Sequence, residues 1–393
     1  MLNIIRKLET KILKEDTNRY KRYLLKSIDF TIPIVGIVGQ RGVGKSTLLI
    51  QYANLLKKIY EPYKSLYFSY DYASNIDIRL FDLVKELHKV GAEYLVIDKI
   101  DKFGDFEEEL AKIHEIFPHV KIIFSASSVF IKQSNILKLY PLKGLSYREF
   151  LEIKLNIELP SFTLQELLSD SVYIVNKLED KFTPLEYFNE YLLCGYYPFY
   201  FNKQNNYVRE LNRVINQTID VDLLSLGLVK VNFLDRLKKL LILIAKSSPT
   251  NLNITEIASK LEVSRNSVYA YLRHLERGGL VNSVLSSKKR ESRLSKPEKI
   301  YLDNTNLPYC LAIEEKMEIV RETFFVSQLK DDYSLKVNAD GNFLLNDKFI
   351  FEVGIKNRDL KQIQIENQHY LVIDTDKTED KFKIPLWLFG FLY

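Results

Sequence analysis

The stretch that decides the fold is Gly39-Gln40-Arg41-Gly42-Val43-Gly44-Lys45-Ser46. It matches the phosphate-loop pattern G-x-x-x-x-G-K-[ST] at every fixed position. Glycines let such a loop curl so that successive backbone N–H groups face phosphate oxygens, and the helix that follows adds its positive N-terminal end. We expect Lys45 to reach the β- and γ-phosphates of ATP and the Ser46 hydroxyl to bind Mg²⁺. The expected nucleotide contacts are Gly39, Gln40, Arg41, Gly42, Val43, Gly44, Lys45, Ser46 and Thr47.

The residues around this loop predict a doubly wound α/β domain with a parallel sheet. Apolar runs of strand length alternate along the chain with segments of helical periodicity. Such alternation is typical of parallel sheets covered by helices. The expected strands are 32–38, 66–69, 94–98 and 120–125, and the expected helices are 48–59, 78–90 and 107–117, after a basic, partly amphipathic helix within residues 1–30.

A phosphate-loop protein also needs a carboxylate at the end of a neighbouring strand to hold magnesium through water. Asp98 closes the apolar run 94–98 and is the expected residue, with a helix cap or a solvent-facing strand end as the alternative. Many ATPases place Glu directly after this Asp to polarise the attacking water, whereas this chain has Lys99. A lysine beside phosphates stays charged and cannot act as a general base. We therefore expect ATP binding with slow or absent hydrolysis; Asp101 is an alternative base without geometric support.

A polar end, Ser125-Ala126-Ser127-Ser128, closes the fourth expected strand. A side chain here, with Ser127 as the candidate, is expected to contact the γ-phosphate or to orient water. Serine is also common at helix caps and turns, so a purely local role is the alternative.

The order of these features resembles a family of prokaryotic AAA-type ATPases. Besides the loop, 94–98 and 125–128, two stretches carry the resemblance: Tyr140-Pro141-Leu142-Lys143-Gly144-Leu145-Ser146-Tyr147-Arg148-Glu149-Phe150-Leu151 and Tyr191-Leu192-Leu193-Cys194-Gly195-Tyr196-Tyr197-Pro198. The resemblance implies an ATPase domain, a helical segment, a winged helix and a C-terminal domain of unknown function with a restriction-endonuclease-like core. It also implies Glu in place of Lys99, and it makes Arg148 the candidate for a basic residue that faces the nucleotide, with a surface ion pair as the alternative.

Four domains are expected on this basis. They are a P-loop ATPase domain over 1–150, a helical domain over 151–245, a winged helix over 246–312, and an α+β restriction-endonuclease-like domain over 313–393.

The winged helix is also predicted directly from the residues. An amphipathic helix at 253–261, a turn at 262–264 and a second helix at 265–276 have the spacing of a helix-turn-helix, and Ser264 suits the cap of the second helix. The basic segment 286–293 is the expected wing. Both elements fit phosphate contact in or beside the major groove of duplex DNA, although such modules also serve as lids or protein docks. The candidate DNA contacts are Arg265, Asn266, Ser267, Tyr269, Arg273, Lys288, Lys289 and Arg290.

The C-terminal segment has the residue types of a magnesium-dependent nuclease but not the usual spacing. Such sites cluster carboxylates around the metal and place an acid and a lysine on one face of a strand. Here Glu352 and Lys356 are four apart, which restores the same face only if Gly354 makes no bulge. Glu322 and Asp340 (or Asp347) are the other candidates. We expect a retained fold with a degenerate site, and nuclease activity as a remoter alternative.

Composition excludes some classes of protein but does not identify a function. The 393 residues carry a formal net charge of +5, a weak pointer to nucleic acid, and the absence of a long uncharged apolar stretch predicts no membrane span. Two widely separated cysteines and the lack of a signal-peptide pattern predict a cytoplasmic protein. The leading expectation is an ATP-binding switch or ATPase that engages DNA. A nucleotide-dependent module for protein partners is the second, and an ATP-regulated nuclease the third.

Overall fold

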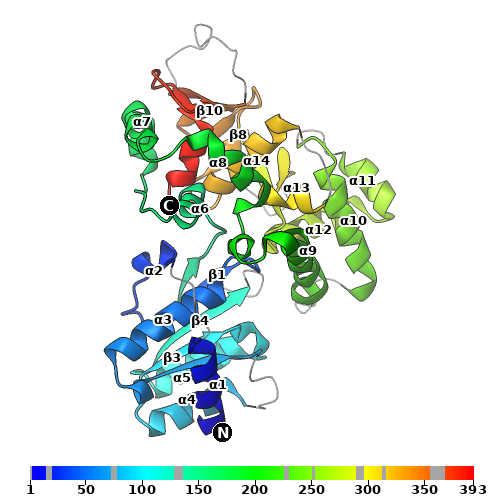
Figure 1. The fold of residues 1–393 in the computed structure, drawn as a ribbon. Helices are drawn as coiled ribbons and strands as arrows, with labels where there is room; N and C mark the ends of the chain where they lie inside the picture. Colours follow the sequence, from blue (N-terminus) through cyan, green and yellow to red (C-terminus); the bar gives the residue numbers. More distant parts are fainter. Residues whose placement is uncertain are drawn as a thin grey trace. The chain divides into compact units, whose positions relative to one another are not determined.

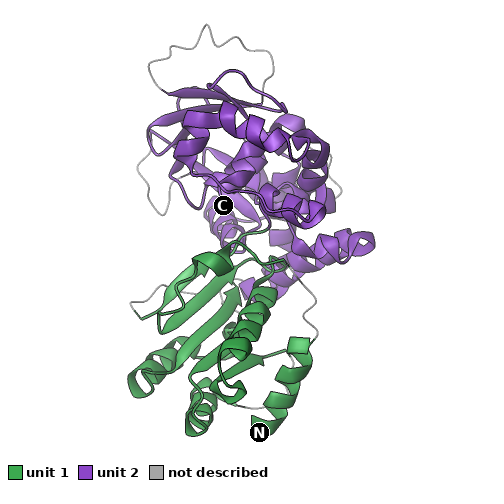
Figure 2. Cartoon of the chain, turned by 60° about the vertical axis from the view of Figure 1, so that its left-hand side comes forward, with its two compact units in different colours: residues 1–144 green, residues 145–393 purple. Residues whose placement is uncertain are grey.

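The structure is a computed structural model that describes residues 2–14, 20–71, 78–127, 136–224, 230–249, 253–288, 296–311, 316–354 and 368–393. The chain divides into two compact units, residues 1–144 and 145–393 (Figure 2). Each unit has its own sheet, and each is described by itself.

Unit 1 is a parallel five-stranded sheet with helices packed against it (Figure 1). The strand order is β2-β3-β4-β1-β5, so β4 lies between the strand that leads into the phosphate loop and the strand that ends at Asp98. The strands are β1 (Ile34–Gly39), β2 (Ser65–Ser69), β3 (Tyr94–Asp98), β4 (Lys121–Ser127) and β5 (Lys138–Pro141). The helices are α1 (Leu2–Lys14), α2 (Leu24–Ser27), α3 (Lys45–Ile59), α4 (Leu80–Lys89) and α5 (Phe106–Ile116).

The parallel P-loop sheet expected from the sequence is confirmed, with two local differences. Within the described part of the first 30 residues there are two helices, α1 and α2, instead of one. The edge strand β5 was not predicted, because it is short, half exposed and ends in Pro141, so it lacks the apolar run that identifies the central strands. The buried strands and the apolar face of α4, with Leu80, Leu83 and Val84, share one core.

Unit 2 is built on a mixed seven-stranded sheet of order β12-β11-β10-β9-β8-β6-β7. Its strands are β6 (Val281–Ser286), β7 (Lys299–Leu302), β8 (Leu335–Val337), β9 (Phe343–Leu345), β10 (Phe349–Val353), β11 (His369–Ile373) and β12 (Lys383–Pro385). Its main helices are α6 (Tyr147–Leu155), α7 (Leu164–Glu179), α8 (Pro184–Glu190), α9 (Tyr207–Gln217), α10 (Leu234–Ala245), α11 (Ile254–Leu261), α12 (Arg265–Arg277), α13 (Asn306–Cys310) and α14 (Met317–Leu329).

The helices α6, α7 and α8 share a single apolar core with the C-terminal sheet. This core contains Phe150 and Phe188 from the helices, Phe351 from β10 and the fully buried Trp387 near the C-terminus. Segments some 200 residues apart in the sequence therefore fold as one body, and the first part of the expected helical domain is a layer on the last domain.

The two sequence stretches after the phosphate loop that carry the family resemblance pack on each other in unit 2. Ser146 and Glu149 form a reciprocal capping box that starts α6. A Cβ at Gly195 would lie 2.9 Å from the Phe150 ring and 2.5 Å from that of Tyr191, so only glycine fits there. The Tyr191 hydroxyl donates to the Leu145 carbonyl at 2.7 Å. These motif residues thus have a packing role.

Candidate functional site

The phosphate loop connects β1 to α3 in unit 1. Two of its residues, Gly42 and Gly44, have φ values of 83° and 102°, in the left-handed region that glycine enters without steric cost. Gly44 directly precedes the first residue of α3, so the loop ends at a helix N-terminus. The local geometry is therefore that of a loop shaped to bind an anion.

The Lys45 side chain folds back over the loop. Its Nζ donates to the carbonyls of Gly39 and Gln40, both at 2.7 Å. These bonds keep the ammonium group half-buried at the loop, where it would form an ion pair with an anion bound by the loop.

The carboxylate of Asp98 lies next to the start of α3. The Ser46 hydroxyl donates to Asp98 Oδ1 at 3.1 Å, and the Ser125 hydroxyl donates to the same oxygen at 2.5 Å. Asp98 is only 4% exposed. Because β4 lies between β1 and β3 in the sheet, the end of β4 delivers Ser125 to the space between the loop and Asp98. A hydroxyl and a carboxylate side by side are hard oxygen donors of the kind that Mg²⁺ prefers, so these residues fit the expected ion.

Lys99, the departure from the expected Glu, has an unusual backbone conformation. Its φ is 63°, in the left-handed region that few residues other than glycine adopt. Its N–H donates to the Ser125 hydroxyl at 2.9 Å, and its Nζ forms an ion pair with Asp71. The side chain at this position therefore carries a positive charge to a neighbouring acid, and it offers no acceptor for a water proton.

The serine that contacts Asp98 is Ser125, two residues before the candidate chosen from the sequence. Ser127 is buried at the end of β4, in register with Gly39 of β1. Ser128 lies outside the described residues. The sequence marked the right strand end, and Ser125 and Ser127 share one face of the strand. The register decides which of them meets Asp98, because Ile97 pairs with Phe124 and the next residue, Asp98, lies level with Ser125.

Arg148, the candidate for a residue facing the nucleotide, belongs to α6 of unit 2. Its guanidinium group donates to the Tyr393 carbonyl at 2.9 Å and pairs with Glu152 at 2.9 Å. The residue is buried, with 7% exposed. The ion-pair role is thus observed, in a buried setting and not on the surface.

The comparisons with known proteins agree with this geometry. Residues 31–168 match a family model described as an AAA domain, and residues 185–316 match a domain of unknown function. The first segment is an AAA-type P-loop ATPase domain. An uncharacterized protein of Methanocaldococcus jannaschii is 24% identical to this chain over 391 residues, covering 90% of this chain and 80% of that protein.

Two solved structures are also similar to parts of this chain. A signal transduction ATPase with numerous domains and a tetratricopeptide repeat sensor, from Pyrococcus horikoshii, is 15% identical; the match covers 79% of this chain and 45% of that one, with a TM-score of 0.26. The AMPPCP-bound DnaA of Aquifex aeolicus is also 15% identical, over 69% of this chain and 88% of that one, with a TM-score of 0.25. This chain thus spans less than half the length of the first.

One residue near the phosphate loop of the AAA-type domain was missed in the sequence. Arg22, just before α2, is 5% exposed and donates from Nη1 to the Val43 carbonyl at 2.5 Å. Its Nη2 donates to the carbonyls of Lys143 and Gly144 at 2.8 and 2.9 Å. Arg22 belongs to no motif, and it bonds to main-chain carbonyls, which any residue type provides. Neither its neighbours in the sequence nor the identity of its partners could therefore predict its role.

Five of the candidate DNA-binding residues, from Arg265 to Arg273, lie on α12, which a short turn joins to α11. Asn253 caps α11, Ser264 caps α12, and β6 and β7 follow as an antiparallel pair. Arg265, Asn266, Arg273 and Lys288 are exposed, Tyr269 is half-buried, and Ser267 is half-buried against the Ser264 hydroxyl. Lys289 and Arg290 lie outside the described residues.

The C-terminal acids are not gathered around one point. Glu322 on α14 pairs with Lys299 at 3.1 Å and accepts a 2.5 Å hydrogen bond from Tyr301. Asp340 lies exposed in a turn, and Glu352 is buried on β10. Within the described residues, no group of three or more His, Cys, Asp or Glu side chains is placed to hold a metal ion.

The extended backbone that would place Glu352 and a following lysine on one face ends with β10. Gly354 has a φ of 111° and ends the extended run, so the alternation of faces does not continue through it. Lys356 lies outside the described residues. Asp347, the other acid considered, is exposed and pairs with Lys336 at 2.9 Å.

Every helix within the described residues is too short or too polar to span a membrane.

Proposed function

We propose that this chain is a nucleotide switch that binds Mg-ATP through Lys45, Ser46 and Asp98, hydrolyses it slowly, and engages duplex DNA through its helix-turn-helix. The observation that carries the proposal is the contact of Ser46 with Asp98 at 3.1 Å, directly beside the phosphate loop. This pair would hold Mg²⁺, the ion that neutralises charge on the β- and γ-phosphates, while the loop and Lys45 hold the phosphates themselves.

Slow hydrolysis follows from the side chains around Asp98. A water that attacks the γ-phosphate needs an acceptor that orients it and takes its proton. Lys99 occupies the position directly after Asp98, and its ammonium group is paired with Asp71. Ser125 gives its proton to Asp98 and accepts from the Lys99 N–H, so its hydroxyl is already used on both sides. The chain therefore binds ATP but hydrolyses it slowly.

The DNA-binding part of the proposal rests on the exposed face of α12 and the hairpin that follows. Arg265, Arg273 and Lys288 are exposed, and positive side chains on such a face suit the DNA backbone. The β6–β7 pair has the place of a wing after the second helix. We interpret this module as a winged helix in an arrangement that leaves its second helix accessible to the major groove.

One experiment tests both parts. ATP turnover and DNA affinity are measured on the full chain, with and without the other ligand, over a series of salt concentrations. We expect measurable ATP binding, slow turnover, and a DNA affinity that falls steeply with salt. Replacing Arg265, Arg273 and Lys288 by Ala should make the log–log salt slope shallower by about 2 to 3, since each lost phosphate contact removes about 0.9.

A charge-matched control separates a local contact from a general charge effect. Lys58, Lys85 and Lys102 are exposed in unit 1, and their joint replacement by Ala removes the same three charges. We expect this variant to keep the salt slope of the wild type. Equal slopes for both triple variants would contradict the winged-helix assignment, and the absence of any salt-sensitive DNA binding would remove DNA from the proposal.

A protein-binding module is the second candidate function, because unit 2 also exposes apolar side chains. Leu193, Val208 and Tyr309 are 51%, 38% and 49% exposed and line a hollow of about 700 Å³. Apolar side chains gathered at one place on a surface are typical of sites that bind other molecules. Full-length protein that binds no DNA but still binds ATP would favour this alternative.

A further inference from the structure

Two arginines of unit 1 use the same chemistry in different places. Arg6 of α1 donates to the main-chain carbonyls of Pro62, Tyr63 and Ser65, and Arg22 donates to those of Val43, Lys143 and Gly144. The planar guanidinium group suits this task, since it offers several N–H donors in a fixed fork.

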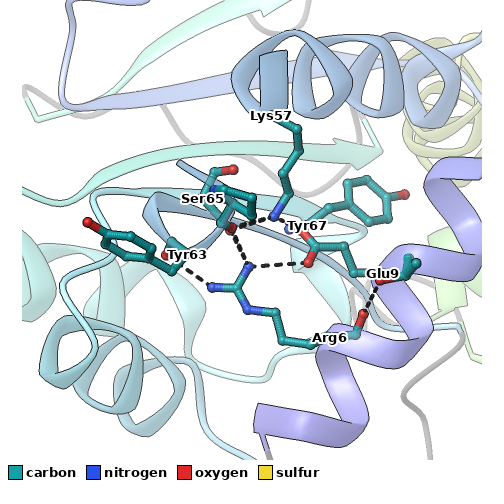
Figure 3. Close-up of polar contacts among 8 residues, drawn as sticks. Arg6, Glu9, Lys57, Tyr63, Ser65 and Tyr67 are labelled. Carbon is teal, nitrogen blue, oxygen red and sulfur yellow. Dashed lines mark hydrogen bonds and ion pairs between the residues drawn. The ribbon is translucent and has the colours of Figure 1, made fainter. Parts of the chain in front are cut away.

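The Arg6 network stabilises an edge of the sheet (Figure 3). β2 is one of the two edge strands of this sheet, and Glu9 of α1 accepts a hydrogen bond from the Tyr67 N–H at 2.8 Å. Lys57 pairs with Glu9 at 2.9 Å and donates to the Ser65 carbonyl at 2.9 Å. Side chains of α1 and α3 therefore satisfy backbone groups that a further strand would otherwise pair with.

The Arg22 network lies at the phosphate loop instead. Val43 is placed between the two left-handed glycines, and its carbonyl accepts from Arg22 Nη1 at 2.5 Å. A loop that turns its N–H groups toward phosphates turns some carbonyls away from them, and a buried carbonyl needs a donor. Because a peptide unit is planar, fixing the Val43 carbonyl also fixes the direction of the Gly44 N–H. Arg22 thus orients one of the donors of the loop.

The other nitrogen of Arg22 holds the segment 142–144, where the chain leaves unit 1. This segment also contacts the first residue of the loop, because a Cβ at Gly39 would lie 2.2 Å from the Leu142 carbonyl oxygen. The Leu142 N–H donates to the Val38 carbonyl at 2.7 Å. The phosphate loop is therefore linked to 142–144 at two points, at Gly39 through direct packing and at Val43 through Arg22.

We propose that Arg22 is a positioning residue of the nucleotide site, which holds the Gly44 N–H toward the phosphates and links the phosphate loop to the exit segment 142–144. The inference rests on the proposed nucleotide binding and adds a consequence to it. When a nucleotide orders the loop, the exit segment is ordered with it. Nucleotide binding then changes the order of residues 142–144, where the chain passes into the next unit.

The test measures Mg-ATP affinity by calorimetry on the full chain and amide hydrogen exchange at 142–144. We expect Arg22→Ala to weaken ATP binding about 10-fold or more, because charge-assisted hydrogen bonds to two parts of the site are lost. Added guanidinium ion at low millimolar concentration should restore part of this affinity. Arg22→Lys, which keeps the charge but not the fork, should bind ATP weakly and lose the protection that ATP gives to 142–144 in the wild type.

Arg6→Ala is the matched control, since it removes an arginine with three carbonyl partners from the same unit. We expect it to lower the melting temperature while ATP affinity stays within about two-fold of the wild type, because the coupling of distant sites is usually small. Folded Arg22→Ala and Arg22→Lys proteins with wild-type ATP affinity and ATP-dependent protection would overturn the inference. Wild-type protein that does not bind ATP would instead overturn the proposed function, and the inference with it.

Discussion

Two regions of this molecule contain carboxylates in patterns that suggest a magnesium site, and the fold treats them differently. At the AAA-type domain, Asp98 meets Ser46, which is 52 residues away in the sequence. In unit 2, Glu322 is bound to Lys299 and Tyr301, and Asp340 lies exposed in a turn. In unit 1 parallel strands end at one edge of the sheet and bring their terminal residues together. Glu322 lies on α14 and Asp340 in the turn between β8 and β9, so neither stands at the end of a parallel strand. Suitable residues form a site only where the fold brings their side chains together.

The largest expected effect is at Lys45. Lys45→Ala removes a charged donor from the phosphates and should weaken ATP binding about 100-fold or more. Calorimetry with Mg-ATP measures it. Lys58→Ala is the control, since this exposed lysine lies on the same helix away from the loop. Equal affinities of the two variants would show that the loop is not the nucleotide site.

Asp98 tests the metal half of the comparison. With Asp98→Asn, we expect the gain in ATP affinity on adding Mg²⁺ to shrink about 10-fold, because a carboxylate that attracts the ion becomes neutral. ATP titrations with Mg²⁺ and with EDTA measure this gain. Asp82→Asn, at an exposed acid paired with Arg79, should behave as the wild type. A gain unchanged by Asp98→Asn would place the ion elsewhere.

Glu322 tests the other half. Glu322→Gln leaves the almost fully buried Lys299 side chain, 5% exposed, without its counter-charge. We expect the free energy of unfolding to fall by about 1 kcal/mol, a modest loss because Glu322 itself is partly exposed. Urea unfolding with and without Mg²⁺ measures it. If Mg²⁺ stabilised the Asp98→Asn chain, and Glu322→Gln removed that effect, unit 2 would hold a metal and the comparison would fail.

The smallest expected effect is at Lys99. Lys99→Glu restores an acceptor beside Asp98 and should raise ATP turnover about three-fold. This is far less than a complete base catalyst provides, because the variant loses the ion pair with Asp71 and the left-handed backbone at this position does not favour glutamate. Steady-state phosphate release measures it. Lys102→Glu introduces the same charge at an exposed position nearby. Equal turnover of the two variants would mean that another step limits hydrolysis.

The sequence predicts most of the fold of unit 1, because its strands are buried runs with helical segments between them. The phosphate loop and Asp98 are predictable for the same reason, since both follow directly after such strands. β5 is not, because an exposed edge strand has no continuous apolar pattern. Arg22 and Ser125 are not either, because their roles depend on strand order and on main-chain partners far away in the sequence.

In unit 2 the local pattern predicts elements but not their association. The cap predicted at Ser264 marks the start of α12 correctly, whereas Asn253, predicted as the first residue of the preceding helix, is the cap of α11. The common core of α6 with β10 and Trp387 has no local pattern, because it joins opposite ends of the unit. The spacing of Glu352 and Lys356 could not show whether the two side chains share a face. It assumed an extended strand, and the positive φ of Gly354 ends that strand directly after Val353.

The strand β6 gives unit 2 a mechanical property. Its first part pairs with β7, and its last two residues, Leu285 and Ser286, pair with Lys336 and Val337 of β8. One continuous strand is thus both an arm of the hairpin beside α12 and a member of the C-terminal sheet. A force applied to the hairpin is transmitted along that strand, so we expect the β6–β7 hairpin and the C-terminal sheet to turn together.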